Sequence, residues 1–240
     1  MSTAASTVVA MDVILVPGLW LDARSWADIT PALDAAGHTT HPLTMPGVGV
    51  PASGSSQIGI SDWVDAVVAQ IDAIGGPVVL VGHSGGGNVV WGAADARPDE
   101  VARVVFVDTL PPPDGGRISE FPVVDGVIPF PGWEFFDDED VADLDERARA
   151  RGLALTSSVP ARVPTDPIPL TGGGRHRVPV TILFGTMDDA TLRAAVAQWG
   201  AYGDEFAMID DVEIVTLGTN HWPQFSKPEG LAEALAGAIR

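Results

Sequence analysis

Cysteine is absent from the 240 residues of this chain. Its absence excludes disulfide bonds, thiolate nucleophiles, zinc ribbons and cysteine-ligated iron–sulfur clusters. Basic residues are also scarce, with 13 Lys and Arg against 32 Asp and Glu, which gives a formal charge of −19. So few cations cannot form a stripe that displaces counterions from a phosphate backbone, and an anionic membrane surface repels such a chain. We therefore expect neither nucleic acid nor a membrane among its partners.

Long hydrophobic runs are missing too, because Gly, Pro and Asp divide an apolar content of 46% into short pieces. None approaches the roughly 20 residues that cross a bilayer. Residues 1–10 lack the basic side chains that open a secretory signal, so we expect a cytoplasmic protein. The apolar fraction excludes disorder, and α/β chains of this length commonly fold as one unit. We predict a single domain over residues 1–240.

Short runs of β-branched residues alternate with amphipathic stretches along the chain. This alternation is typical of an α/β fold in which helices cover both faces of a mostly parallel sheet. The runs lack a period of two, which indicates strands buried on both faces; they span 13–16, 78–81, 104–107, 180–184 and 212–217. A helix is expected to begin at Ser61 as N-cap and to end before Gly75, and a second to begin at Pro228.

Residues 111–174 interrupt the alternation of strands and helices. They contain three consecutive prolines, several aromatic residues, an acidic run at 137–140 and a proline-rich exit. An insertion of this length is uncommon in a compact domain unless it forms a lid or a binding element, so we predict a cap. The acidic run is expected to begin a solvated helix rather than to bind calcium.

A Gly-His-Ser-Gly-Gly motif at 82–86 follows the run at 78–81 and precedes a helix expected over 88–96. A turn from strand to helix strains the backbone at Ser84, and Gly82 and Gly86 allow neighbouring elements to approach closely. The turn presents the Ser84 hydroxyl at the carboxyl edge of the sheet, where open α/β folds bind ligands. A flexible linker, the alternative, would not lie between a buried strand and a helix. Ser84 is therefore the candidate nucleophile.

With this motif the sequence resembles the α/β-hydrolase family over nearly its whole length. The residues that carry the resemblance are Gly-His-Ser-Gly-Gly at 82–86, Val-Pro-Gly-Leu-Trp at 16–20 with Trp26, Gly-Thr-Met-Asp at 185–188 and Thr-Asn-His-Trp-Pro at 219–223. Within the family the chain looks most like small cap-bearing esterases related to plant methylesterases and hydroxynitrile lyases. It departs from many members at Pro17, where they carry His before Gly18.

A serine hydroxyl is a weak nucleophile at its free pKa, so a base must take its proton and a third group must orient that base. His221 follows the last predicted strand, at the sheet edge that carries Ser84. The chain order nucleophile, acid, base and the matching family position favour His221 as the base over a surface role. The remaining histidines lack this placement: His38, His41, His83 and His176.

Three aspartates that follow predicted strands are candidates for the acid that orients His221. The resemblance assigns the loop of Asp188 to this carboxylate in most members, and a small change of register would substitute Asp189. Asp108 ends an earlier strand, where some members place the acid. Each could instead be a surface carboxylate in a chain with 32 acidic residues. We rank Asp188 first, Asp108 second and Asp189 third.

A tetrahedral intermediate needs N–H donors aimed at its oxygen. One donor is expected to be the backbone N–H of Gly85, directly after the nucleophile. The resemblance implies Leu19 as the second donor, ahead of Trp20. Trp20 and Trp222 near the inferred site suggest an apolar substrate of moderate size, although such rings are at least as often packing. His83 directly precedes Ser84 and is expected to pack beside it or support it. Together with Trp20 and Trp222 it forms our candidate substrate-binding set.

These observations predict a serine hydrolase that cleaves a carboxylic ester or lactone of a neutral, fairly apolar small molecule through an acyl-enzyme. Serine in the motif argues against haloalkane dehalogenases and epoxide hydrolases, which carry Asp there. The alternatives are an acid–base enzyme like the hydroxynitrile lyases and a ligand-binding protein with little turnover. No cofactor and no metal is implied. The Gly-x-Gly-x-x-Ala string at 47–52 resembles a dinucleotide-binding motif, but it contains Pro51 instead of opening a helix. The three glycines at 85–87 lack the Lys that a phosphate-binding loop requires.

Overall fold

A computed structural model describes residues 9–239 of the chain. The expectation about a secretory signal concerns residues 1–10, of which 1–8 lie outside the described residues. Within the described range, no helix is both long enough and apolar enough to cross a membrane.

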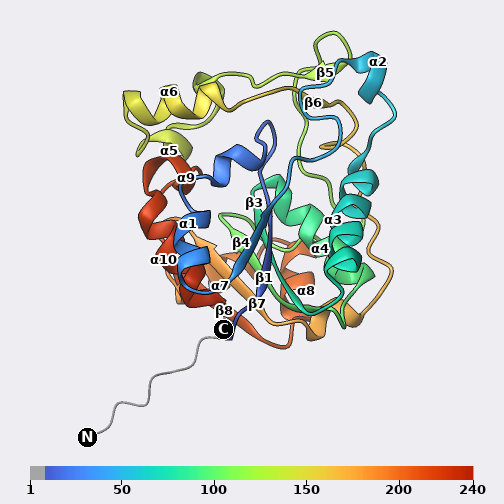
Figure 1. Cartoon of the computed structure of the whole chain (residues 1–240), viewed down its shortest axis with the longest axis vertical. Helices are drawn as coiled ribbons and strands as arrows, with labels where there is room; N and C mark the ends of the chain where they lie inside the picture. Colours follow the sequence, from blue (N-terminus) through green and yellow to red (C-terminus); the bar gives the residue numbers. More distant parts are fainter. Residues whose placement is uncertain (1–8, 240) are drawn as a thin grey trace, which may run out of the picture.

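Six parallel strands form the central sheet, in the order β2-β1-β3-β4-β7-β8 (Figure 1). Each hydrophobic run predicted as a strand lies in one of them, so the predicted α/β fold is confirmed. The strands are β1 (Asp12–Val16), β2 (Thr39–Pro42), β3 (Val78–His83), β4 (Val101–Val107), β7 (Val180–Phe184) and β8 (Val212–Thr216).

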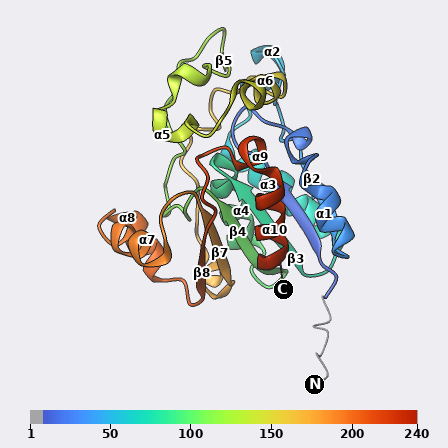
Figure 2. The same ribbon diagram turned by 90° about the vertical axis from the view of Figure 1, so that its left-hand side faces the viewer.

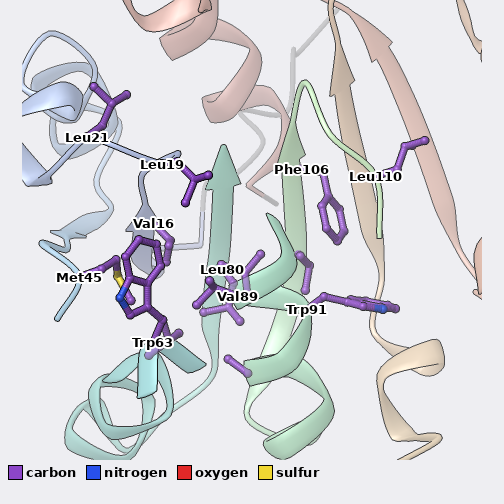
Figure 3. Packing of buried hydrophobic residues seen from close by; sticks show 14 of the residues in the cluster. Val16, Leu19, Leu21, Met45, Trp63, Leu80, Val89, Trp91, Phe106 and Leu110 are labelled. Carbon is purple, nitrogen blue, oxygen red and sulfur yellow. The ribbon is translucent and has the colours of Figure 1, made fainter. Parts of the chain in front are cut away.

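Alternate residues of the inner strands pack into two separate cores, one on each face of the sheet. On one face, Leu80 and Phe106 pack with α3 (Ile60–Ile74) and α4 (Gly85–Ala96), through residues such as Trp63 and Trp91 (Figure 3). On the other face, the intervening strand residues pack with α1 (Thr30–Ala35) and α10 (Pro228–Ala238). Burial of both faces explains why the inner strands show no hydrophobic alternation.

The last strand differs from the prediction. Most of β8 is only half-buried, and Thr216 is exposed, because β8 has a neighbour on one side only. A hydrophobic run therefore identified the strand correctly but overstated its burial. The loop that carries His221 starts from this less buried edge.

Helix ends follow local capping chemistry. Helix α3 ends at Gly75, which takes the left-handed conformation, as predicted. Its N-cap is Gly59 and not Ser61, because the Asp62 carboxylate accepts the Gly59 N–H at 2.8 Å and closes the first turn from within the helix. Pro228 occupies the first turn of α10, as predicted.

Residues 111–174, here called the 111–174 segment, connect β4 to β7 and lie above the sheet near its carboxyl edge (Figures 1 and 2). Their elements are short, and the acidic run does begin a helix, with Asp137 as N-cap of α5. The elements are β5 (Val127–Ile128), η2 (Trp133–Phe135), α5 (Asp138–Val141), α6 (Glu146–Ala154) and β6 (Val159–Pro160). The remaining elements are η1 (Ala23–Trp26), α2 (Ala52–Ser55), η3 (Gly174–Arg177), α7 (Asp189–Val196), α8 (Ala201–Ala207) and α9 (Pro223–Ser226).

Candidate active site

Ser84 lies at the sharp turn between β3 and α4, with φ 51° and ψ −126°. A side chain in this region of backbone space is strained by roughly 1–3 kcal/mol, and the surrounding packing must hold it there. Gly82 and Gly86 permit that packing, because a Cβ on Gly82 would lie 2.6 Å from the Gly86 carbonyl oxygen and one on Gly86 would lie 2.6 Å from that of Pro17. The close approach expected from the motif is present.

His221 lies in the loop between β8 and α9, beside Ser84. The Ser84 hydroxyl lies 2.9 Å from His221 Nε2, and His221 Nδ1 lies 2.7 Å from Asp108 Oδ2. With Nδ1 protonated, the ring donates to Asp108 and accepts from Ser84. Such a chain of hydrogen bonds can take up the serine proton while the hydroxyl attacks an electrophile.

Asp108 ends β4 with φ 47° and is held from two sides. Its Oδ2 faces His221, and its Oδ1 accepts the Gly185 backbone N–H at 2.9 Å. Burial disfavours the charged carboxylate, but these hydrogen bonds outweigh it and hold the pKa of Asp108 below its ordinary value. Asp108 is therefore an anion that can orient the His221 ring and stabilise its positive charge.

The structure corrects the ranking of the acids, which placed Asp188 first. Asp188 is the N-cap of α7, where its carboxylate accepts the Thr191 N–H at 2.9 Å. The carboxylate at His221 is that of Asp108, which follows β4, the strand directly beside β3. Asp189, the third candidate, forms an exposed ion pair with Arg193.

His83 does not line the cavity above Ser84, which corrects its place in the substrate-binding set. It is fully buried, and its Nε2 donates to the His221 carbonyl oxygen at 2.8 Å, while Gln224 lies 3.4 Å from Nδ1. Burial and the neighbouring His221 lower the pKa of His83 to about 3. His83 is thus a neutral support beneath the His221 loop, in agreement with a packing role.

The other histidines lie away from this arrangement. His41 pairs with Asp12 at 2.7 Å on the outer strands of the sheet. His176 lies 3.0 Å from Glu205, which also binds Arg175. His38 is buried, and neither of its ring nitrogens has a hydrogen-bond partner among the described residues.

A cavity of about 320 Å³ opens above Ser84 and His221. Half of its wall residues are aromatic, and both tryptophans that we expected near the substrate belong to them. The walls comprise Leu19, Trp20, Ile118, Ser119, Phe121, Phe135, Phe136, Asp137, Asp140 and Trp222. The 111–174 segment thus supplies most of the wall opposite the sheet. This volume suits a small organic molecule.

The two expected oxyanion donors adjoin each other at the floor of this cavity. A Cβ on Gly85 would lie 3.1 Å from the Leu19 side chain. Within residues 9–239, no hydrogen bond uses the backbone N–H of Leu19 or Gly85. Trp20, the next residue, has φ 68°. It belongs with Ser84 and Asp108 to the four non-glycine residues that have positive φ in the described range. Backbone strain of this kind gathers at functional sites.

Sequence reasoning gave no role at the site to Asp140 and Asn220, although Asp140 ends the acidic run and Asn220 directly precedes His221 in the Thr-Asn-His-Trp-Pro motif. The Asp140 side chain lines the cavity, and its carbonyl accepts the His221 N–H at 3.2 Å. Burial raises the pKa of Asp140; the nearby His221 opposes this rise, and neighbouring carboxylates, Asp108 first among them, add to it. Asn220 precedes His221 and contacts the 111–174 segment. Only the fold brings these residues to the site.

A metal centre is not apparent in the described residues. No group of three or more His, Asp and Glu side chains there is arranged to hold an ion. The polar groups around Ser84 are instead paired with one another in the serine, histidine and aspartate chain.

Comparisons with known proteins concern the family and the fold of the chain. The sequence model of the alpha/beta hydrolase family matches residues 13–234. Lipase LipV of Mycobacterium tuberculosis is 46% identical over 71 residues, which cover 29% of this chain and 26% of that protein. Esterase PIR7B of rice, Oryza sativa subsp. japonica, is 39% identical over 104 residues, covering 41% of this chain and 38% of that protein. The chain thus matches well under half of the length of these relatives.

Solved structures extend the similarity of the fold to nearly the whole chain. An extracellular alpha/beta-hydrolase from a Paenibacillus species superposes with a TM-score of 0.75 at 22% identity, covering 96% of this chain and 99% of that one. At this level of identity the likeness concerns the fold.

Proposed function

The chain belongs to the alpha/beta hydrolase family, and on that premise we propose that it is a serine hydrolase that cleaves a carboxylic ester or lactone through an acyl-enzyme on Ser84. The hydrogen-bonded chain from Ser84 through His221 to Asp108 is the observation that carries the proposal. Its distances of 2.9 and 2.7 Å lie in the range for a nucleophile, its base and the group that orients the base.

In the first half-reaction, Ser84 Oγ attacks the ester carbonyl carbon while its proton passes to His221 Nε2. The negative oxygen of the tetrahedral intermediate takes hydrogen bonds from the backbone N–H groups of Leu19 and Gly85. His221 then gives the proton to the leaving oxygen as the carbon–oxygen bond breaks. Asp108 stabilises the positively charged ring throughout, because its own pKa is held low.

In the second half-reaction, a water molecule attacks the carbonyl carbon of the acyl-enzyme. His221 takes the water proton and returns it to Ser84 Oγ when the acyl bond breaks, so the enzyme regains its starting state. The acid product leaves as a carboxylate. The carboxylates of Asp137 and Asp140 in the cavity wall disfavour its rebinding.

We further propose that the 111–174 segment is a cap that selects the substrate. Rings from this segment pack directly against Trp20 in the cavity wall, and the centroid of Phe121 lies 4.8 Å from that of Trp20. Rings in such numbers favour a neutral, fairly apolar small molecule. Names of related proteins, among them a carbendazim hydrolyzing esterase from Nocardioides and a methylesterase from Arabidopsis thaliana, support ester-like substrates.

The decisive experiment measures cleavage of a panel of activated short-chain esters by the wild-type protein and by Ser84→Ala. We expect the wild type to show a burst of alcohol release followed by a steady rate. The variant should lose at least about 10³-fold in kcat, since removal of a triad serine costs up to ~10⁶-fold. Cleavage that survives Ser84→Ala would refute the proposal.

The two other hypotheses are less well supported. A hydroxynitrile-lyase-like enzyme would react with an organophosphate at Ser84 but would show no acyl burst, and a binding protein would release no product. The relatives found are described as a lipase and as esterases, and neither alternative is favoured by them.

A further inference from the structure

The loop that carries His221 is fastened to the 111–174 segment by three hydrogen bonds. The His221 N–H donates to the Asp140 carbonyl at 3.2 Å, and the Asn220 N–H donates to Asp143 Oδ2 at 2.9 Å. The Asn220 side-chain amide donates to the Glu139 carbonyl. All three acceptors lie in one short stretch, α5 and the turn that follows it.

The opposite side of this loop rests on the protein core. His83 Nε2 donates to the His221 carbonyl at 2.8 Å, so the peptide groups on both sides of the His221 Cα are held. Upstream, the backbone turns at Gly218 with φ 64° after the half-buried strand β8. On that side the Leu217 N–H donates to the Phe184 carbonyl and the Gly218 N–H to the Gly185 carbonyl, each at 2.8 Å, and Thr219 is buried. The next two residues, Asn220 and His221, donate their N–H groups to the 111–174 segment instead, so this segment restrains the backbone directly at the base.

Restraint of this backbone matters because the ring must satisfy two partners at once. A displacement of about 1 Å is enough to cost roughly 10²-fold in rate when a base must face its nucleophile. The His221 ring donates to Asp108 at 2.7 Å and accepts from Ser84 at 2.9 Å. A small rotation of the loop would lengthen both bonds.

We propose that Asn220 and Asp143 are positioning residues, which act through His221 and make the reactive arrangement depend on contact with the 111–174 segment. This inference rests on the proposed function. It adds that the segment serves the chemistry as well as substrate selection: when the segment moves away, the base loses its alignment with Ser84. A protein with a displaced segment is then unreactive even though Ser84 and Asp108 keep their places.

Two kinds of substitution separate positioning from general damage. Asn220→Asp keeps the size of the side chain but removes the amide donor and faces the Glu139 carbonyl with a negative charge. Asp143→Ala removes the acceptor for the Asn220 N–H, whereas Asp143→Asn retains an oxygen that can accept it. Glu146→Gln, on the exposed first turn of α6, removes one negative charge outside the contact, as Asp143→Ala does within it, and is the matched control for that variant.

We expect Asn220→Asp and Asp143→Ala each to lower kcat about 10- to 100-fold while KM stays within about threefold, because the cavity walls are unchanged. The rate at which an organophosphate inactivates Ser84 should fall by the same factor, since that reaction also needs the base. Asp143→Asn should restore kcat to within about threefold of wild type, and Glu146→Gln should match wild type. Unfolding in urea, monitored by Trp fluorescence, checks that each variant is folded.

Folded Asn220→Asp and Asp143→Ala variants with kcat within twofold of wild type would overturn the inference. So would an equal loss in Asp143→Asn, because that result would trace the effect to the lost charge and not to the hydrogen bond. If either variant does not fold, Asn220→Ala replaces it under the same criteria. Activity that persists in Ser84→Ala would instead refute the proposed function, so the two failures are distinguishable.

Discussion

The carboxyl edge of the sheet and the 111–174 segment meet at one cavity but are built in opposite ways. Ser84 and Asp108 end strands whose neighbouring residues are buried on both faces, and both hold positive φ values. The segment contains only short elements, helices of three to nine residues and strands of two, and many of its side chains are half-buried or exposed, Phe135 among them at 48% exposure. Residues that react with the substrate thus lie on the rigid part, and residues that contact its periphery lie on the part held by fewer contacts.

His221 belongs to neither part completely. Its loop starts at the exposed edge strand, rests on His83 below and is bound by the 111–174 segment above. The difference between the two regions therefore has a functional meaning: one region fixes two members of the candidate triad, and contact between the regions fixes the third.

The largest effect that would test this comparison is the loss of the acid at the sheet edge. We expect Asp108→Asn to lower kcat about 10³- to 10⁴-fold, because an amide that donates toward Nδ1 favours the wrong tautomer of His221. Asp188→Asn is the control and should stay within twofold, since Asn is as good an N-cap as Asp. Steady-state kinetics of both variants on one neutral ester show whether Asp108 or Asp188 is the acid. The reverse pattern would restore Asp188 as the acid.

A second test concerns the buried support beneath His221. The pKa of His83 is lowered to about 3 in the folded protein, against 6.5 for a free side chain. As the pH falls below 6.5, His83 takes up a proton in the unfolded chain but stays neutral in the folded protein. Neutral His83 therefore contributes fully to the stability of the fold above pH 6.5, and this contribution is lost on acidification. By linkage this loss amounts to ~2 kcal/mol between pH 7.5 and pH 5.

His83→Gln removes the titrating group but keeps an amide that can donate to the His221 carbonyl. Over the same pH interval, the free energy of unfolding of this variant should fall by ~2 kcal/mol less than that of the wild type. Urea titrations at both pH values, analysed with a common m-value, give the comparison. Parallel pH dependences in the two proteins would show that His83 is not held neutral by the fold.

The smallest expected effect lies on the 111–174 segment. An ester with a remote carboxylate should react more slowly than its neutral isostere, because Asp137 and Asp140 line the cavity in a chain of charge −19. Asp140→Asn should reduce the difference in kcat/KM between the two esters about two- to fivefold, and added salt should reduce this difference in the wild type. The raised pKa of Asp140 also predicts a smaller difference as the pH falls, since the protonated carboxyl carries no charge.

The quantity to compare is the ratio of kcat/KM for the two esters at low and high ionic strength. Glu146→Gln again supplies the control, because it removes one negative charge outside the cavity. Equal rates for both esters in the wild type at low salt would show that the acidic residues keep the surface hydrated but do not affect the choice of substrate.

Part of this organisation could be predicted because it is written in local sequence. The strand, the glycines and Ser84 at 78–86 are adjacent in the chain, and steric rules alone make such a stretch turn sharply. The helix of the acidic run and the end of α3 at Gly75 are local in the same sense. Ser61 failed as a cap because the helix already begins at Ile60, where the Asp62 carboxylate accepts the Gly59 N–H and closes the first turn.

The sequence by itself determined the fold class and singled out the candidate nucleophile and the candidate base, since each depends on a pattern within a few residues of the chain. Only the tertiary structure decided which aspartate faces His221, because the Asp108 carboxylate meets a histidine 113 residues further along the chain, whereas the Asp188 carboxylate caps α7. It likewise decided that Asn220 and Asp143, 77 residues apart, share a hydrogen bond. Contacts between distant segments follow from the packing of the whole sheet and its covering helices, which no local pattern encodes.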